Sequence, residues 1–143
     1  MKTTISLVPR GLRNNNPLNI RKGGAVPFMG EKRNSTDPEF RQFCEMAYGY
    51  RAAFVIMASY YKKYNLNTPE AIIRRWAPPT ENHTEGYINT ACQLACLRRD
   101  QILTLSDGLL YQKLVSAMSM IENGIPADSN QVHRGFSLQN QIS

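Results

Sequence analysis

The sequence predicts an α+β fold that is mostly α, with a small irregular or hairpin-like lobe ahead of a helical domain. Proline and glycine punctuate short apolar pieces throughout residues 1–47, which is typical of turns and hairpins. From Gly49 onward, apolar residues recur at three- and four-residue steps, the spacing of an amphipathic helix. With 143 residues, 42% of them hydrophobic, the chain is long enough to bury a core of its own. We expect a single domain over residues 1–125 and a polar tail over residues 126–143.

The first two predicted helices have the clearest signals. Tyrosine, phenylalanine and methionine form a wide apolar stripe from about Gly49 to Lys63. Thr68 is a good N-cap for the next helix, which has Pro69 at its first position. This helix must end before Pro78, because a proline disfavours helical conformation in the residue that precedes it.

Two more helices are predicted further along the chain. Asn82 and Glu85 have the spacing of a capping box at the start of one helix. Ser106 is the expected N-cap of the last helix, and Asn123 with Gly124 forms a left-handed C-cap at its end. We expect the polar residues beyond it to lie on the surface or to be partly disordered.

The positive charge is concentrated near the N-terminus. Residues 1–33 contain seven basic residues and one acidic residue, whereas residues 34–143 contain ten of each. The net charge of +6 therefore belongs to the N-terminal segment, which would attract polyanions such as nucleic acid, anionic lipid or the acidic polymers of a bacterial envelope.

The sequence predicts no integral membrane contact. The longest uncharged apolar run, residues 52–61, is far shorter than the roughly 20 residues that cross a bilayer. The N-terminus also lacks the apolar region of a secretory signal. We therefore expect a protein that is cytoplasmic when made and that leaves the cell, if at all, by lysis, in a phage particle or through a dedicated secretion machine.

Cysteine and histidine offer little chemistry. Cys44, Cys92 and Cys96 make an odd count and are predicted to be small buried hydrophobic residues rather than a disulfide framework. With only His83 and His133 present, we predict no metal site, no cofactor and no histidine base catalysis.

Carboxylates remain as candidates for catalysis. Cleavage of a glycosidic bond needs a carboxylic acid that protonates the leaving oxygen, often with a second carboxylate nearby. Glu31, Glu45 and Glu81 are the candidates here, because they lie in polar positions outside the helical periodicity. Glu81 is the strongest, since it follows a rigid Trp-Ala-Pro-Pro segment and opens a helix. The simpler interpretation of Glu45 is that it is solvated.

The segment "RNNNPLNIR" supplies short amide donors and acceptors in a turn-forming context. It predicts either a tight hydrogen-bonded turn or a loop that contacts a glycan or peptide, and these two roles are compatible.

Six blocks of the sequence together resemble a known family. They are similar to a lysozyme-like family of phage virion structural proteins, which occurs in phages and in gut Bacteroides genomes. The resemblance covers about residues 10–125 and implies a lysozyme-like helical fold, binding of bacterial peptidoglycan, and a location in a phage particle or cell envelope after release. The blocks are "RGLRNNNPLNIR", "PFMGE", "DPEFRQF", "YGYRAAFVIMASYYKKY", "IIRRWAPPTENHTEGYI" and "LVSAMSMIENG".

A more distant likeness, to bacterial glucosaminidases of the flagellar type, suggests the binding residues. In those enzymes the asparagine-rich strand and the following hairpin line the glycan groove. The likeness implies that five residues lie near a glycan strand: Asn14, Asn15, Asn19, Arg21 and Tyr87. To these we add three polar neighbours, Arg13, Asn82 and Thr84. The predicted substrate-binding residues are Arg13, Asn14, Asn15, Asn19, Arg21, Asn82, Thr84 and Tyr87.

One departure from those glucosaminidases concerns catalysis. They carry the acid glutamate on a helix upstream of the asparagine-rich segment, and here only residues 1–10, which include no Asp or Glu, precede it. Either Glu31, Glu45 or Glu81 has taken the role, or the groove is kept and catalysis is lost. The sequence therefore favours glycan binding over glycan cleavage and leaves enzymatic activity open.

Two other functions compete with peptidoglycan binding. One is a purely structural, non-catalytic virion component. The other is a nucleic-acid-binding accessory of a mobile element, which is disfavoured because no recognition motif is present and aromatic residues are not interleaved with the basic ones. The sequence does not predict an oligomeric state.

Overall fold

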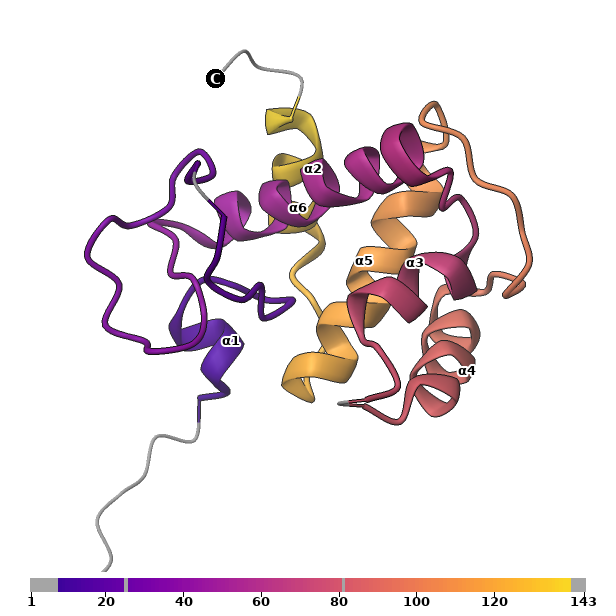
Figure 1. The fold of residues 1–143 in the computed structure, drawn as a ribbon, viewed down its shortest axis with the longest axis horizontal. Coiled ribbons are helices and arrows are strands. Elements are labelled where there is room, and N and C mark those ends of the chain that lie inside the picture. Colours follow the sequence, from indigo (N-terminus) through magenta and orange to yellow (C-terminus); the bar gives the residue numbers. More distant parts are fainter. Residues whose placement is uncertain (1–7, 25, 81, 140–143) are drawn as a thin grey trace, which may run out of the picture.

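The structure is a computed structural model, and it describes residues 8–24, 26–80 and 82–139. In Figure 1 the irregular N-terminal part lies on one side and most of the helices lie on the other. Within the described residues the N-terminal part has no strand, only two isolated antiparallel bridges, Arg21 with Phe40 and Glu31 with Phe43. The prediction of a mostly helical fold is confirmed, whereas the finer prediction of a lysozyme-like α+β fold is not. The helices are α1 (Arg10–Arg13), α2 (Met46–Tyr64), α3 (Pro69–Trp76), α4 (Thr84–Ala95), α5 (Gly108–Asn123) and α6 (Ser129–Leu138).

Helices α2 and α3 form where apolar spacing and capping predict them. The Oγ1 of Thr68 accepts a hydrogen bond from the backbone N–H of Ala71 at 3.2 Å, so the predicted N-cap of α3 is present. The helix ends at Trp76. Ala77, which precedes Pro78, is no longer in helical conformation.

Helix α4 begins differently from the prediction. Its N-cap residue is His83, and no side chain caps its first turn. Glu85 forms ion pairs with Arg74 and Arg99 instead of a capping box with Asn82. The two guanidinium groups are stronger partners for the carboxylate than a backbone N–H, which explains why the capping box is absent.

Helix α5 confirms the predicted end but not the predicted start. It begins after Asp107 rather than Ser106, and the Asp107 carboxylate accepts hydrogen bonds from the backbone N–H and side-chain hydroxyl of Thr104. Gly124 closes the helix in left-handed conformation, with φ of 75°.

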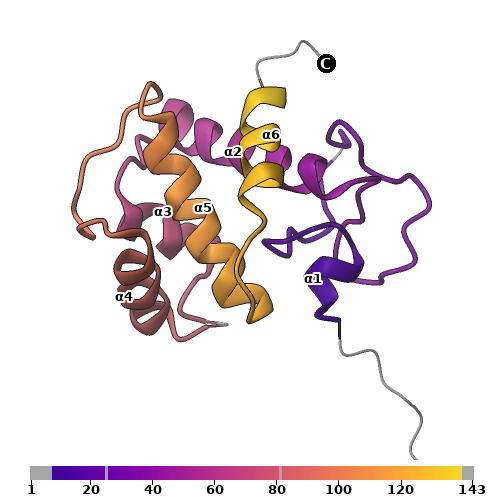
Figure 2. The ribbon, with the colours of Figure 1, turned by 180° about the vertical axis from the view of Figure 1, so that it is seen from behind.

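Part of the predicted polar tail forms α6, which packs against α2 and crosses it in Figure 2. A Cβ atom at Gly135 would lie only 2.6 Å from the Cβ of Tyr50, so this glycine permits the close approach of the two helices. Phe136 packs edge-on against Phe54, with ring centroids 5.1 Å apart. Only a few apolar residues anchor this helix, and for that reason its sequence resembles a surface tail.

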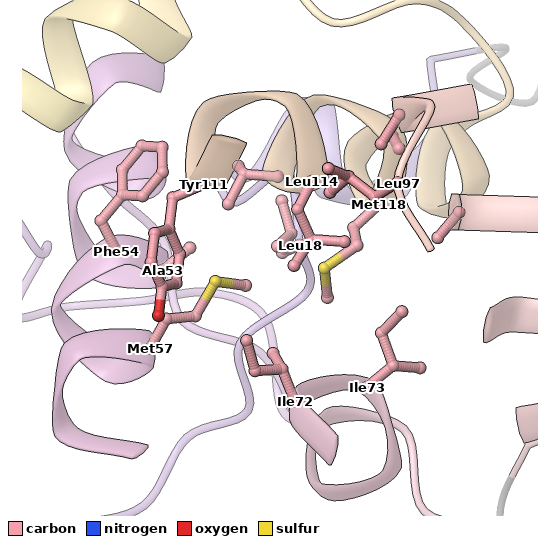
Figure 3. Close-up of a cluster of buried hydrophobic side chains, with 14 of the residues drawn as sticks. Leu18, Ala53, Phe54, Met57, Ile72, Ile73, Leu97, Tyr111, Leu114 and Met118 are labelled. Atoms are coloured by element: carbon pink, nitrogen blue, oxygen red, sulfur yellow. The ribbon is translucent and has the colours of Figure 1, made fainter. Parts of the chain in front are cut away.

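The main core brings α2, α3, α4, α5 and α6 together. Leu18, from the N-terminal part, reaches into it and lies near Leu114 and Met118 in Figure 3. Of the three cysteines, Cys92 is buried as predicted, whereas Cys44 and Cys96 are exposed. None of the described helices combines the length and apolar character that crossing a membrane requires.

Candidate functional site

The N-terminal lobe, defined here as residues 8–44, is held together by buried polar groups. The Asp37 carboxylate accepts two hydrogen bonds from Arg10, at 2.7 and 2.8 Å, and one from the Asn14 amide at 3.0 Å. It also accepts the backbone N–H groups of Glu39 and Phe40. The Arg10 guanidinium is the main cause that lowers the pKa of Asp37 well below its usual range. This carboxylate is therefore charged, and both of its oxygens accept hydrogen bonds.

The asparagine-rich segment forms the predicted hydrogen-bonded turn. Asn16 is fully buried, donates to the carbonyls of Ile20 and Arg41, and accepts from the Ile20 N–H, each at 2.9 Å. Asn15 and Asn19 have φ of 51° and 52°, a conformation that asparagine tolerates better than most residues. Much of this segment is therefore internal framework.

A polar groove runs between the N-terminal lobe and the helices. Its volume is about 300 Å³, and two aromatic side chains and several polar ones line it. Trp76 is fixed in place because its Nε1–H donates to the Leu18 carbonyl at 3.3 Å. A second depression, of about 310 Å³, shares Asn82 with this groove and extends over α4. We call the first depression the polar groove, and it is lined by Leu18, Asn19, Arg21, Phe40, Trp76, Ala77, Pro78, Asn82 and Glu122.

Glu122 is the carboxylate that faces the asparagine-rich segment across this groove. Its Oε1 accepts a hydrogen bond from the Asn19 amide at 2.8 Å, and its Oε2 accepts one from the Tyr87 hydroxyl at 2.9 Å. Burial and the charge of Glu122 raise the pKa of Tyr87 strongly. The phenol therefore stays protonated and donates a hydrogen bond to Glu122. Next to it, Asn123 donates to the Pro17 carbonyl at 2.8 Å. The end of α5 thus ties the N-terminal lobe to α4 (Figure 1).

Of the three predicted catalytic carboxylates, the structure describes Glu31 and Glu45, and neither lies at the polar groove. Glu31 pairs with Arg41 at 2.6 Å inside the N-terminal lobe, and both side chains are largely buried. Glu45, at the start of α2, pairs with Arg134 of α6 at 2.7 Å on the surface. Glu81 lies outside the described residues. Neither Glu31 nor Glu45 lines the groove, and the catalytic roles of all three stay predictions.

The predicted substrate-binding residues divide into two groups. Asn19, Arg21 and Asn82 line the polar groove, and Tyr87 lines the adjoining depression. The other four make contacts elsewhere: Arg13 donates to the Val8 carbonyl, Asn14 binds Asp37, Asn15 binds the Phe43 carbonyl, and Thr84 donates to the Ala77 carbonyl.

Glu122 was not among the predicted site residues, because the candidate carboxylates were chosen from polar positions outside the helical periodicity and Glu122 lies in the last predicted helix. The chain instead brings in a helix from about one hundred residues downstream. A sequence signal was nevertheless present. Glu122 lies in the last turn of α5, where the helix dipole disfavours negative charge. An acidic residue at such a position needs donors from elsewhere, and here Asn19 and Tyr87 supply them.

The side chains that line the polar groove are suited to binding a ligand. The groove offers amide groups, a guanidinium and aromatic surfaces, the mixture that polar, ring-containing ligands require. Both Glu122 oxygens accept hydrogen bonds, so protonating a leaving group would require one of these bonds to be given up. No second carboxylate lines the groove within the described residues.

Comparison with known proteins places the chain in a family. No model of a known protein family matches it. It is 41% identical over 137 residues to Protein P5 of Pseudoalteromonas phage PM2, an alignment that covers 94% of this chain and 84% of that protein. The phage part of the resemblance drawn from the sequence is confirmed, whereas its lysozyme-like, peptidoglycan and Bacteroides parts receive no support from this relative. The chain belongs to the family of Protein P5 of phage PM2.

Proposed function

We propose that this protein is a non-catalytic component of a phage particle and that its polar groove binds the glycan strands of host peptidoglycan. The particle role is supported by a phage relative that matches almost the whole chain. A similarity of this extent favours a shared role for the complete fold rather than for one transplanted motif.

The glycan part of the proposal is supported by the composition of the groove. Trp76 and Phe40 offer apolar ring surfaces, while Asn19 and Asn82 offer amide groups at its edge. Sugars present both C–H faces and hydroxyl groups, and peptidoglycan adds acetamido groups and carboxylates. Arg21 and the positive N-terminal segment would attract those carboxylates.

One observation favours glycan binding over glycan cleavage. Asn19 and Tyr87 each donate a hydrogen bond to the Glu122 carboxylate. An acid catalyst must hold a proton beside the leaving oxygen. A carboxylate that accepts a hydrogen bond on each oxygen acts instead as an acceptor. Here it fixes the positions of the Asn19 and Tyr87 side chains. Glycan would bind there without being cleaved.

The test uses purified full-length chain and isolated sacculi at moderate ionic strength. We expect the protein to pellet with the sacculi and to release no muropeptides. An Asn19→Ala and Asn82→Ala double variant should remain in the supernatant, with a Lys32→Ala variant outside the groove as the matched control. Failure of the wild type to pellet would contradict glycan binding, and release of muropeptides would contradict the non-catalytic role.

The particle role is tested on the phage that encodes the chain. Peptides of this protein should copurify with particles through a density gradient, in constant ratio to the major coat protein. If the protein remains entirely in the lysate fraction, the particle role is wrong. A salt-sensitive shift of DNA mobility that Arg21→Ala and Lys22→Ala abolish would favour nucleic-acid binding instead.

A further inference from the structure

A second groove, unrelated to the polar groove, lies on the other surface of α5. Its volume is about 460 Å³, within the range of small-molecule sites. Residues from the end of α4, the outer face of α5 and the start of α6 enclose it. We call it the alanine-floored groove, because Ala95 and Ala117, with Val132, form its buried floor.

Helix α5 has an unusual outer face at this groove. Residues 109, 112, 113, 116, 117 and 120 lie on one face by their three- and four-residue spacing, and all six line the groove. Three of the six are polar, as is usual on the exposed face of a surface helix, and the other three are apolar. Here Leu109 is 65% exposed and Met120 36% exposed, and Leu94 of α4 adds a third rim residue at 44%. Three large aliphatic side chains around one depression indicate a binding surface.

Lys113 is the only charged residue that lines the alanine-floored groove within the described residues. No ion pair with a carboxylate is found for it among the described residues, whereas Arg74, Arg99 and Arg134 each have one. The groove therefore combines an apolar trough with a single positive charge at its rim. This combination complements a ligand that has an alkyl chain and one negative charge.

The charge also argues against a second copy of this chain as the occupant. In a two-fold contact the same patch is buried on both copies, so two Lys113 side chains would be buried in one interface, and no carboxylate lines the groove within the described residues. Burying like charges is unfavourable unless each is paired. An anionic amphiphile satisfies both the trough and the lysine.

We infer that the alanine-floored groove binds a single acyl chain with an anionic head group, the chain lying over Ala95 and Ala117 and the head at Lys113. The chemistry is shared by a free fatty acid and by an acyl chain of an anionic phospholipid. This site is independent of glycan binding at the polar groove.

The test is calorimetric titration of the full-length wild-type chain with octanoate, decanoate and laurate below their micellar concentrations. Affinity should rise by about twofold to fourfold per added methylene while the chain still lies in the groove. Dodecyltrimethylammonium, which has an alkyl chain of nearly the same length as laurate and a cationic head, should bind at least tenfold more weakly. Equal affinity for the two head groups would overturn the proposal.

Variants locate the site. Lys113→Ala should weaken laurate binding about tenfold, whereas Lys63→Ala, an exposed lysine on α2, should leave it unchanged. Ser116→Phe should fill the groove and abolish binding. Because Ser116 is half-buried, Leu109→Gln serves as a second variant that cannot disturb the core, and it should weaken binding several-fold. Laurate binding that survives both Ser116→Phe and Leu109→Gln would overturn the site.

Two further arms identify the source of the acyl chain. Cosedimentation with phosphatidylglycerol vesicles that is lost in Lys113→Ala and Ser116→Phe would support a lipid source, while laurate binding without cosedimentation would support a free fatty acid. If laurate fails to bind and the wild type self-associates in a manner that Ser116→Phe prevents, the groove takes a second copy and the proposal is wrong.

Discussion

In the N-terminal lobe the buried side chains include Asn14, Asn16, Asp37 and Arg41, whereas in the helical body, residues 46–138, most of them are aliphatic or aromatic. The lobe has almost no regular secondary structure, so its backbone groups need side-chain partners, and short amides supply them. The helices satisfy their own backbone and are held together by apolar burial. Polar sequence in the lobe is thus mainly framework, and only its edge reaches the polar groove.

The largest expected effect comes from the junction between these two regions. Gly49 of α2 packs against the N-terminal lobe, and a Cβ atom there would overlap the carbonyl oxygen of Asn15. A glycine-to-alanine change in a helix normally stabilises by about 0.5–1 kcal/mol. Gly49→Ala should instead cost roughly 3 kcal/mol or more, because backbone must move. Chemical unfolding followed by circular dichroism measures this.

The matched control is Gly86→Ala on α4, where a Cβ atom meets nothing within 4 Å. It should stabilise the protein by about 0.5–1 kcal/mol. If both variants change stability in the same direction, the close contact between α2 and the N-terminal lobe is not as described.

The next effect isolates the N-terminal lobe. Asn16→Ala leaves the N–H of Ile20 and the C=O of Arg41 without a partner and takes one of the two donors from the C=O of Ile20, at a cost of about 2–3 kcal/mol. Hydrogen exchange should rise in the lobe while the helical body stays protected. The exposed Asn34→Ala is the control and should change neither. Uniform loss of protection across α2–α5 would mean that the two regions are not separable.

Asp37 makes the stability of the N-terminal lobe depend on pH. Its pKa is lowered in the folded state, chiefly by Arg10, so the folded protein binds this proton less readily than the unfolded chain does. The stabilisation is complete above the unfolded pKa of about 4 and is lost as pH falls below it. Asp37→Asn should therefore cost about 2 kcal/mol near neutral pH and progressively less below about pH 4. A difference between the two proteins that stays constant down to about pH 3 would contradict this assignment.

The helices were the predictable part of the molecule. The apolar spacing of α2 and the Thr68 cap of α3 are local signals, and both are present in the structure. Helix α6 was predicted as a polar tail, because its burial depends on a glycine contact with Tyr50 that no local pattern reveals.

The candidate site was predictable only on one wall. Asn19 and Arg21 follow from the asparagine-rich segment, and Asn82 follows from the segment after Trp76. Glu122 does not, because its contact with Asn19 joins residues at opposite ends of the chain. Its unfavourable place at the end of α5 was the one available signal.

The smallest expected effect on stability is at the groove. Tyr87→Phe removes one hydrogen bond to Glu122 and should cost about 1 kcal/mol. Urea unfolding of this variant beside Tyr64→Phe, an exposed tyrosine, measures the difference. If the two variants are equally stable, the bond between Tyr87 and Glu122 contributes nothing to the link between α4 and α5.

The chain has one tryptophan, and Trp76 lines the polar groove, so its fluorescence reports directly on the glycan proposal. Titration with soluble peptidoglycan glycan fragments should give a saturable change in emission. Replacing Asn19 and Asn82 by alanine should abolish this change, and Lys32→Ala should preserve it. No change in Trp76 emission, in a protein that is folded by circular dichroism, would contradict glycan binding in this groove.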